Sequence, residues 1–283
     1  MTGTPSQGQP QPQGHPQPLP FDDGGAGVPV VLVHAFPVDR RMWAATRAEL
    51  GDGVRLLTPD VAGFGGSTVP DADPSLDAVA DQLASLLDRL GLEQAVVGGL
   101  SMGGYITLAF ARRHPDRLLG VLLADTKATA DTDAAAENRR RIASVALAEG
   151  SARVVVEEVV PNLVGPTTAA ARPEVLEAVR VLAAQADPAA IAWAQRAMAD
   201  RRDSFDVLRR LDVPVLVLVG DEDAVTPLGE AAAMSGTARR ALLHTFDGSG
   251  HLSAMEQPAA FAAALRDWLI EWDLVRRDVV GGD

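Results

Sequence analysis

The feature that most constrains the fold is a Gly-x-Ser-x-Gly motif at residues 99–103, with apolar sequence on both sides. The residues before it are typical of a buried strand, and those from Tyr105 onward are typical of a helix. A strand, a tight turn and a helix form the context in which this motif makes a nucleophile elbow. Gly99 and Gly103 have no Cβ, so the two elements can approach closely. The motif therefore predicts an exposed Ser101 hydroxyl at the N-terminus of a helix.

The rest of the chain alternates between strand-like and helix-like segments. Apolar runs typical of buried strands occur at residues 28–33, 54–60, 118–124, 213–219 and 241–246. Alternation of this kind implies right-handed crossovers, a mostly parallel sheet and helices on both of its faces. We therefore predict an α/β fold.

The alternation stops after Asp125. From about residue 131 to residue 202 the sequence predicts about four helices and no strand. Because this insertion leaves from the C-terminal end of a strand, where ligands bind in open α/β sheets, we expect it to cap the site. The predicted organisation is a disordered Pro/Gln-rich tail at 1–20, a core at 21–126 and 206–283, and a helical cap at 127–205.

Three side chains that can cooperate in nucleophilic catalysis follow predicted strands. A serine hydroxyl needs a base to accept its proton, and the base needs a carboxylate to orient it. Ser101, Asp223 and His251 occur in that order, and parallel strands bring such loops to one edge of the sheet. Two other carboxylates also follow strands. We expect Asp221 to hold its own loop through hydrogen bonds to the backbone, and Asp125 is the second choice for orienting the histidine.

An oxyanion formed by attack on a carbonyl needs two N–H donors. One expected donor is the backbone of Met102, directly after the serine. The other is expected from the loop after the first parallel strand, where Phe36 is the choice because Pro37 has no N–H. His34 in the same loop is expected to brace it through ring hydrogen bonds.

These motifs together resemble the α/β-hydrolase superfamily, in particular its compact bacterial esterase and lactonase members. The matching segments are residues 34–37, 60–67, 99–104, 220–227 and 250–251. The resemblance implies the α/β-hydrolase fold, with a mostly parallel central sheet, helices on both faces and an inserted helical cap.

The resemblance also implies roles for the site residues. Ser101 is the expected nucleophile, His251 the base and Asp223 the acid, with the N–H groups of Phe36 and Met102 as the oxyanion hole. The sequence departs from the family pattern at two places. Ala35 stands where the family usually has glycine, and residues 19–27 show little strand pattern, so we expect the sheet to lack one or both of the family's opening strands. The exposed edge of such a sheet would favour dimerisation, and the sequence leaves both a monomer and a homodimer open.

Composition excludes several classes of function. The net charge of −13 and the pI near 4.8 argue against nucleic acid or an anionic membrane as partner. The chain has no cysteine, no run of about 18 apolar residues and no visible cluster of metal ligands. We therefore expect no cofactor and no metal. Because the N-terminus has no signal-peptide pattern, we expect a cytoplasmic protein.

The resemblance implies a serine hydrolase that cleaves a small carboxylic ester or a lactone through an acyl-enzyme. Acyl (thioester) transfer and carbon–carbon bond hydrolysis by the same triad remain open, as does a non-catalytic binding module on the same fold. The expected partner is a small acyl substrate, either free or attached to a carrier. Trp193 in the insertion is a candidate substrate-binding residue, and ordinary core packing is its other interpretation.

Overall fold

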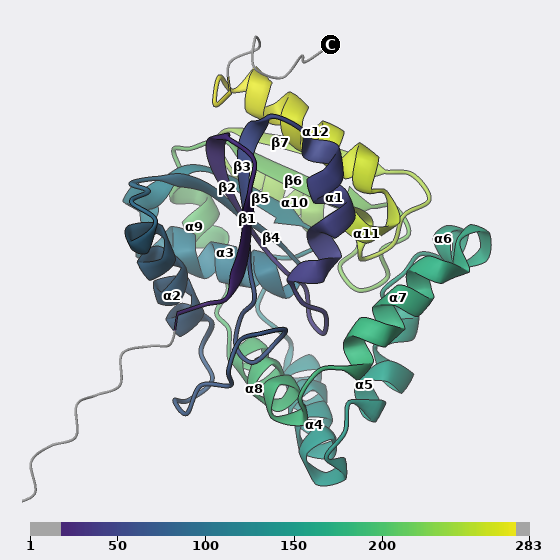
Figure 1. Cartoon of the computed structure of the whole chain (residues 1–283). Helices are drawn as coiled ribbons and strands as arrows, with labels where there is room; N and C mark the ends of the chain where they lie inside the picture. The colour runs from purple at the N-terminus through teal and green to yellow at the C-terminus, as the bar shows by residue number, and fades with distance from the viewer. Residues whose placement is uncertain (1–17, 276–283) are drawn as a thin grey trace, which may run out of the picture.

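The computed structural model describes residues 18–275, which fold around one seven-stranded sheet (Figure 1). The strands are β1 (Phe21–Gly24), β2 (Gly27–Val33), β3 (Gly53–Pro59), β4 (Ala95–Leu100), β5 (Leu118–Ala124), β6 (Val215–Gly220) and β7 (Ala241–Phe246). Their order in the sheet is β1-β3-β2-β4-β5-β6-β7. Only the β1–β3 pair is antiparallel, and the other neighbours are parallel. The predicted mostly parallel sheet is therefore confirmed.

Helices cover both faces of this sheet because successive strand residues point to opposite sides. On β2, Val31 and Val33 pack into one apolar cluster with α2, α3, α9 and α10. Val30 and Leu32 pack into a second cluster with α1 and α12. The bounds are α1 (Ala44–Leu50), α2 (Leu76–Arg89), α3 (Met102–Arg113), α9 (Phe205–Arg210), α10 (Leu228–Thr237), α11 (Ser253–Glu256) and α12 (Pro258–Glu271). Within residues 18–275, no helix is long and apolar enough to cross a membrane.

The opening strand β1 lies within residues 19–27, which showed little strand pattern in the sequence. β1 has only four residues, and two of them are acidic. Asp22 and Asp23 pair with Arg40 at 3.0 Å and Arg55 at 2.7 Å. Because these arginines lie far along the chain, the local sequence reads as a polar loop. One antiparallel opening strand is therefore present at the edge of the sheet, and residues 18–275 contain no second one, which agrees with the expectation that one or both would be missing.

Most of the predicted tail, residues 1–17 of 1–20, lies outside the described residues. Its last residues are placed against the core. Leu19 is 4% exposed, and the backbone N–H of Asp60 donates to the carbonyl of Pro20 at 2.8 Å. Leu19 and Pro20 thus belong to the folded part, which corrects the boundary predicted at residue 20.

The long insertion connects β5 with β6. It contains five helices where the sequence predicted about four, namely α4 (Asp133–Glu149), α5 (Arg153–Glu158), α6 (Pro166–Ala171), α7 (Pro173–Ala184) and α8 (Pro188–Ala199). Figure 1 shows these helices grouped together beyond one end of the sheet, with α4 against α8. The short helix α9 then returns the chain to the core beside α3.

One close contact fixes α12 on the sheet. Trp268 is fully buried, and its ring lies over Gly120 of β5. A Cβ at position 120 would lie 2.7 Å from Cη2 of Trp268 and 3.3 Å from the carbonyl oxygen of Pro214. The first distance is shorter than van der Waals contact allows, so only glycine fits without movement of the ring.

We therefore expect Gly120→Ala to lower the free energy of unfolding by about 1–3 kcal/mol through overpacking. The matched control is Gly229→Ala in α10, because nothing lies within 4 Å of its added Cβ. This control is expected to be neutral or slightly stabilising, since alanine favours a helix more than glycine does. Urea unfolding followed by circular dichroism measures both changes. An unchanged stability in Gly120→Ala would contradict the close contact.

Candidate active site

Ser101 lies in the tight turn between β4 and α3. Its backbone has a φ of +56°, a conformation that L-residues rarely adopt, and its N–H donates to the carbonyl of Ala124 at 2.9 Å. A Cβ at Gly99 would lie 2.4 Å from the carbonyl carbon of Gly103, and a Cβ at Gly103 would lie 2.1 Å from the carbonyl oxygen of Val33. Both glycines are therefore required for the close approach that the motif predicts.

The structure brings Ser101, His251 and Asp223 together from three separate loops. Nε2 of His251 lies 2.8 Å from Oγ of Ser101, and Nδ1 lies 2.8 Å from Oδ2 of Asp223. The side chains of His251 and Asp223 are 1% and 0% exposed. The result is a continuous hydrogen-bonded chain from a hydroxyl through an imidazole to a buried carboxylate.

Asp223 is held in its charged form by its surroundings. Its Oδ1 accepts the N–H groups of Val225 at 2.8 Å and Thr226 at 2.9 Å, and its Oδ2 accepts the Thr226 hydroxyl at 2.7 Å. Burial raises the pKa of Asp223, but His251 and these donors outweigh burial, so the pKa lies below its usual value.

The two alternative carboxylates do not reach the histidine. Asp125 accepts the N–H of Gly220 at 3.0 Å and both the N–H and the hydroxyl of Ser253, at 3.1 Å and 2.5 Å. It therefore ties the end of β6 to the loop after His251. Burial, with the nearby charge of Asp223 as a smaller cause, raises the pKa of Asp125 well above its usual value. Asp221 accepts the N–H of Gly248 at 2.7 Å. This backbone group belongs to the loop after β7, whereas the sequence predicted that Asp221 would hold its own loop.

A further carboxylate, Glu256 of α11, positions the histidine loop and was not predicted. It is fully buried. Its Oε2 accepts the N–H groups of Gly165 at 3.0 Å and Gly250 at 2.9 Å, and its Oε1 accepts that of Leu252 at 3.2 Å. Glu256 thus holds both neighbours of His251 and attaches the insertion to them. Acidic residues on helices are normally exposed, so no pattern in the sequence singles this one out.

Two backbone N–H groups near Ser101 are without hydrogen bonds inside the described part of the chain, those of Phe36 and Met102. Met102 is the first residue of α3, where an N–H has no partner within the helix. The neighbouring Ala35 N–H is occupied by Sδ of Met42 at 3.2 Å. The two predicted donors are therefore both available for a ligand oxygen.

His34 braces the same loop, as predicted. Its Nδ1 lies 3.0 Å from the carbonyl of Ala35, and its Nε2 accepts the N–H of Val61 at 3.1 Å. Burial lowers the pKa of His34, which favours the neutral ring that this pair of contacts requires.

A cavity of about 210 Å³ opens beside Ser101 and His251. Phe36 lines one part of it, and the insertion contributes Ile142 from α4, Leu163 and other residues. Trp193 does not line this cavity. Its side chain is buried in the core, and its indole N–H donates to the carbonyl of Ala72 at 3.3 Å, so the packing interpretation of Trp193 holds. The aromatic residues that line this cavity are Phe36 and Tyr105, and Tyr105 lies on the first turn of α3.

No three His, Asp or Glu side chains within residues 18–275 are arranged to hold a metal ion. Separately, the described residues bring a serine, a histidine and a carboxylate together at this site, with the unbonded N–H groups of Phe36 and Met102 in the same part of the chain fold.

The chain belongs to the alpha/beta hydrolase family, whose sequence model matches residues 30–264. It is 32% identical over 267 residues to 2-hydroxymuconate semialdehyde hydrolase from Pseudomonas sp. (strain CF600), covering 89% of this chain and 90% of that protein. It is 27% identical over 236 residues to 3-oxoadipate enol-lactonase 2 from Acinetobacter baylyi, covering 83% of this chain and 86% of that protein.

Solved structures with a similar fold also include hydrolases. The chain superposes on a malate-bound thermophilic esterase from Thermogutta terrifontis with a TM-score of 0.87 and 45% identity, covering 89% of this chain and 93% of that one. It superposes on the enol-lactonase from Burkholderia xenovorans LB400 with a TM-score of 0.81 and 26% identity, covering 89% and 96%. The fold and the hydrolase class predicted from the sequence are confirmed.

The lowered pKa of Asp223 predicts a pH-dependent contribution to stability. A carboxylate whose pKa is depressed by folding stabilises the protein above its unfolded pKa, and the stabilisation is lost as the pH falls through the folded value. We therefore expect the difference in unfolding free energy between wild type and Asp223→Asn to shrink below about pH 4. Urea unfolding across the acid range measures it. Asp71→Asn, at an exposed position, is the control with little difference at any pH. A difference that does not shrink at all as the pH is lowered from about 4 through the folded pKa would contradict the paired state.

Glu256→Gln replaces one acceptor oxygen by an amide that points its own protons at backbone N–H groups. We expect this to lower the free energy of unfolding by about 1–3 kcal/mol, because buried donors lose their partner. Catalytic turnover should fall with it, since the loop that carries His251 loosens. Glu271→Gln on the exposed end of α12 is the control. Wild-type stability and turnover in Glu256→Gln would show that the loop does not depend on this carboxylate.

Proposed function

We propose that the protein is a serine hydrolase that cleaves small carboxylic esters or lactones through an acyl-enzyme. The observation that carries the proposal is the Ser101–His251–Asp223 chain, with both hydrogen bonds at 2.8 Å, beside a cavity of about 210 Å³. The similarity to an esterase and to enol-lactonases supports the same class of substrate.

In this proposal, Nε2 of His251 takes the proton of the Ser101 hydroxyl as its oxygen attacks the substrate carbonyl. Asp223 accepts a hydrogen bond from the Nδ1–H group of the imidazole, so it fixes the tautomer in which Nε2 is the acceptor. Asp223 then stabilises the positive charge that the ring gains.

The attack produces a tetrahedral oxyanion, and the N–H groups of Met102 and Phe36 are proposed to bind it. Each such donor contributes about 2.7–4 kcal/mol to stabilisation of the transition state. When the intermediate collapses, His251 returns the proton to the leaving alcohol oxygen. Water then attacks the acyl group on Ser101 with His251 again as the base, which releases the acid and restores the hydroxyl.

The helical insertion is proposed to act as a cap. Ala135, Asn138 and Ile142 of α4 line the cavity together with Ser101, so the insertion closes the space in which the acyl group would lie. A cavity of about 210 Å³ is smaller than the ~300–1,000 Å³ of typical drug-sized ligand sites, which favours a short substrate.

Hydrolysis of a carbon–carbon bond beside a carbonyl is the second candidate. The relative named 2-hydroxymuconate semialdehyde hydrolase, at 32% identity, favours it. A panel that compares p-nitrophenyl esters, lactones and acyl thioesters with a dienol–ketone substrate separates the two. Under our proposal, short esters or lactones have a higher kcat/KM than the dienol–ketone substrate. A higher kcat/KM for the ketone would instead support carbon–carbon bond hydrolysis. Transfer of the acyl group to an amine or alcohol in place of water would indicate a transferase.

Ser101→Ala is expected to lower kcat by about 10⁶-fold, as in other serine hydrolases that lose the nucleophile. A fluorophosphonate should label the wild type on the peptide that contains Ser101 and should leave the variant unlabelled, as read by mass spectrometry. Ser144→Ala on the exposed side of α4 is the matched control and should keep wild-type activity. Turnover of wild-type magnitude in Ser101→Ala would end the proposal.

A further inference from the structure

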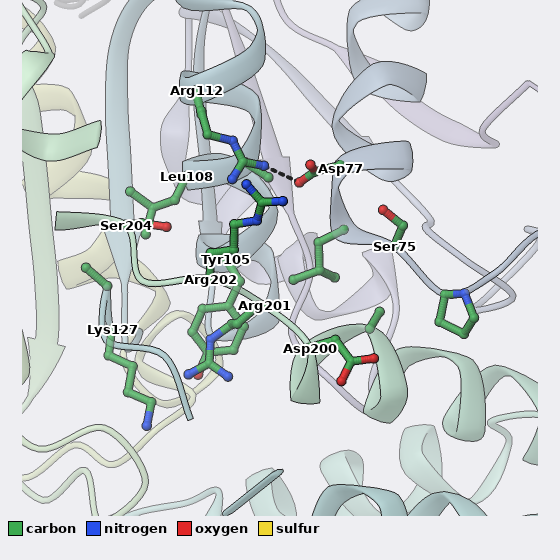
Figure 2. Close-up of a pocket in the computed structure, with 15 residues that line it drawn as sticks. Ser75, Asp77, Tyr105, Leu108, Arg112, Lys127, Asp200, Arg201, Arg202 and Ser204 are labelled. Carbon is green, nitrogen blue, oxygen red and sulfur yellow. Dashed lines mark hydrogen bonds and ion pairs between the residues drawn. The ribbon is translucent and has the colours of Figure 1, made fainter. Parts of the chain in front are cut away.

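A second cavity, of about 200 Å³, lies next to the proposed active site (Figure 2). Tyr105 lines both cavities, whereas neither Ser101 nor His251 lines the second one. The second cavity is formed by the start of α2, the outer side of α3, the segment after β5 and the segment after α8. It is therefore a separate space, and the proposed hydrolysis makes no use of it.

The charges around this cavity are unusual for the chain. Four cationic residues line it, Arg112, Lys127, Arg201 and Arg202, against two acidic ones. The chain as a whole carries a net charge of −13. A concave surface lined with one sign of charge concentrates the field and attracts counter-ions.

The acidic residues at the cavity are already occupied by other cations. Asp77 pairs with Arg112, and Asp200 pairs with Arg140 of α4 at 2.8 Å. These pairs leave Lys127 and Arg202 uncompensated by the acids that line the cavity. An arginine paired with one carboxylate still has further N–H donors, so Arg112 can also contact a ligand.

Lys127 and Arg201 share a single carboxylate with a third cation. The side chain of Asp131 is 1% exposed, and its oxygens lie 2.5 Å from Arg139, 2.8 Å from Arg201 and 3.5 Å from Lys127. The single negative charge of Asp131 therefore compensates only one of the three positive charges around it. The cluster keeps an excess of positive charge between the two cavities.

Arg201 supplies a fixed charge rather than free donors. Its side chain is 6% exposed, its guanidinium lies 4.1 Å from the centre of the Tyr105 ring, and it donates to the carbonyls of Met198 and Thr129. In contrast, Arg202 makes no hydrogen bond or ion pair with any residue of the described part. In Figure 2 its guanidinium points toward the part of the cavity where Arg112 meets Asp77.

We propose that this cavity binds a small dianionic oxyanion, namely a phosphate group, either as free phosphate or on a phosphate monoester. Arg112, Lys127 and Arg202 provide the donors, because guanidinium and ammonium groups make short charge-assisted bonds to phosphate oxygens. The 14-residue helix α2 begins at the rim, at Leu76 with Ser75 as its N-cap, and its N-terminus adds favourable dipole charge. The small volume admits a phosphate group with a short substituent.

Titration calorimetry of the full chain with inorganic phosphate and with glycerol 1-phosphate tests this directly. Saturable binding to the wild type is expected, with Kd raised about tenfold or more in Arg202→Gln and in Lys127→Gln, each of which removes a charge-assisted bond. Arg209→Gln, an exposed arginine away from the cavity, is the matched control and should leave Kd unchanged. Tighter binding of the monoester identifies an organic phosphate as the ligand, and tighter binding of inorganic phosphate identifies the free ion.

The single lysine of the chain gives an independent readout. Phosphate should slow the acetylation of Lys127 by an amine-reactive ester, measured on its peptide, while chloride at equal ionic strength should not. Ser101→Ala should bind phosphate like the wild type, because Ser101 does not line this cavity. The phosphate site is therefore tested separately from the proposed hydrolysis. Absence of saturable binding, or equal Kd in all variants, would overturn the proposal, as would acetylation that phosphate does not slow.

Discussion

The hydrogen-bonded chain from Ser101 through His251 to Asp223 is the interaction on which the rest of the site depends. Its three members come from loops that are far apart in sequence, and each hydrogen bond tolerates only small changes in distance. The parallel sheet brings the loops to one edge, but it does not fix them to that accuracy. Two other buried carboxylates complete the placement, since Asp125 holds the segment after His251 and Glu256 holds the residues on both sides of it.

The helical insertion is joined to this same network rather than added beside it. Glu256 accepts the N–H of Gly165, and Glu222 accepts the N–H and hydroxyl of Thr167, so the segment around α6 is tied to the loops after β6 and β7. The residues of the insertion that line the cavity and the loop that carries His251 are therefore held by common contacts. On its other side the insertion contributes Arg139 to the cationic cluster around Asp131, which lies between the two cavities.

The sequence predicted those features that depend on local pattern. The elbow around Ser101 follows from glycines whose absence of Cβ is a local requirement, and the sheet follows from apolar runs. Features that depend on distant partners were missed. β1 reads as a polar loop because Arg40 and Arg55 compensate its acids only in the fold, and the role of Glu256 needs three backbone donors from elsewhere. For Trp193 the sequence left two interpretations open, because an aromatic residue in an insertion has the same local pattern whether it faces a cavity or the core.

The most direct measurement is a crystal structure of the protein after reaction with a small fluorophosphonate, which imitates the tetrahedral intermediate. The account predicts a covalent bond from phosphorus to Oγ of Ser101 and a phosphoryl oxygen about 2.7–3.1 Å from the backbone nitrogens of Met102 and Phe36. It also predicts that His251 stays hydrogen-bonded to Asp223. An adduct on another residue, or a phosphoryl oxygen directed away from both nitrogens, would contradict the account.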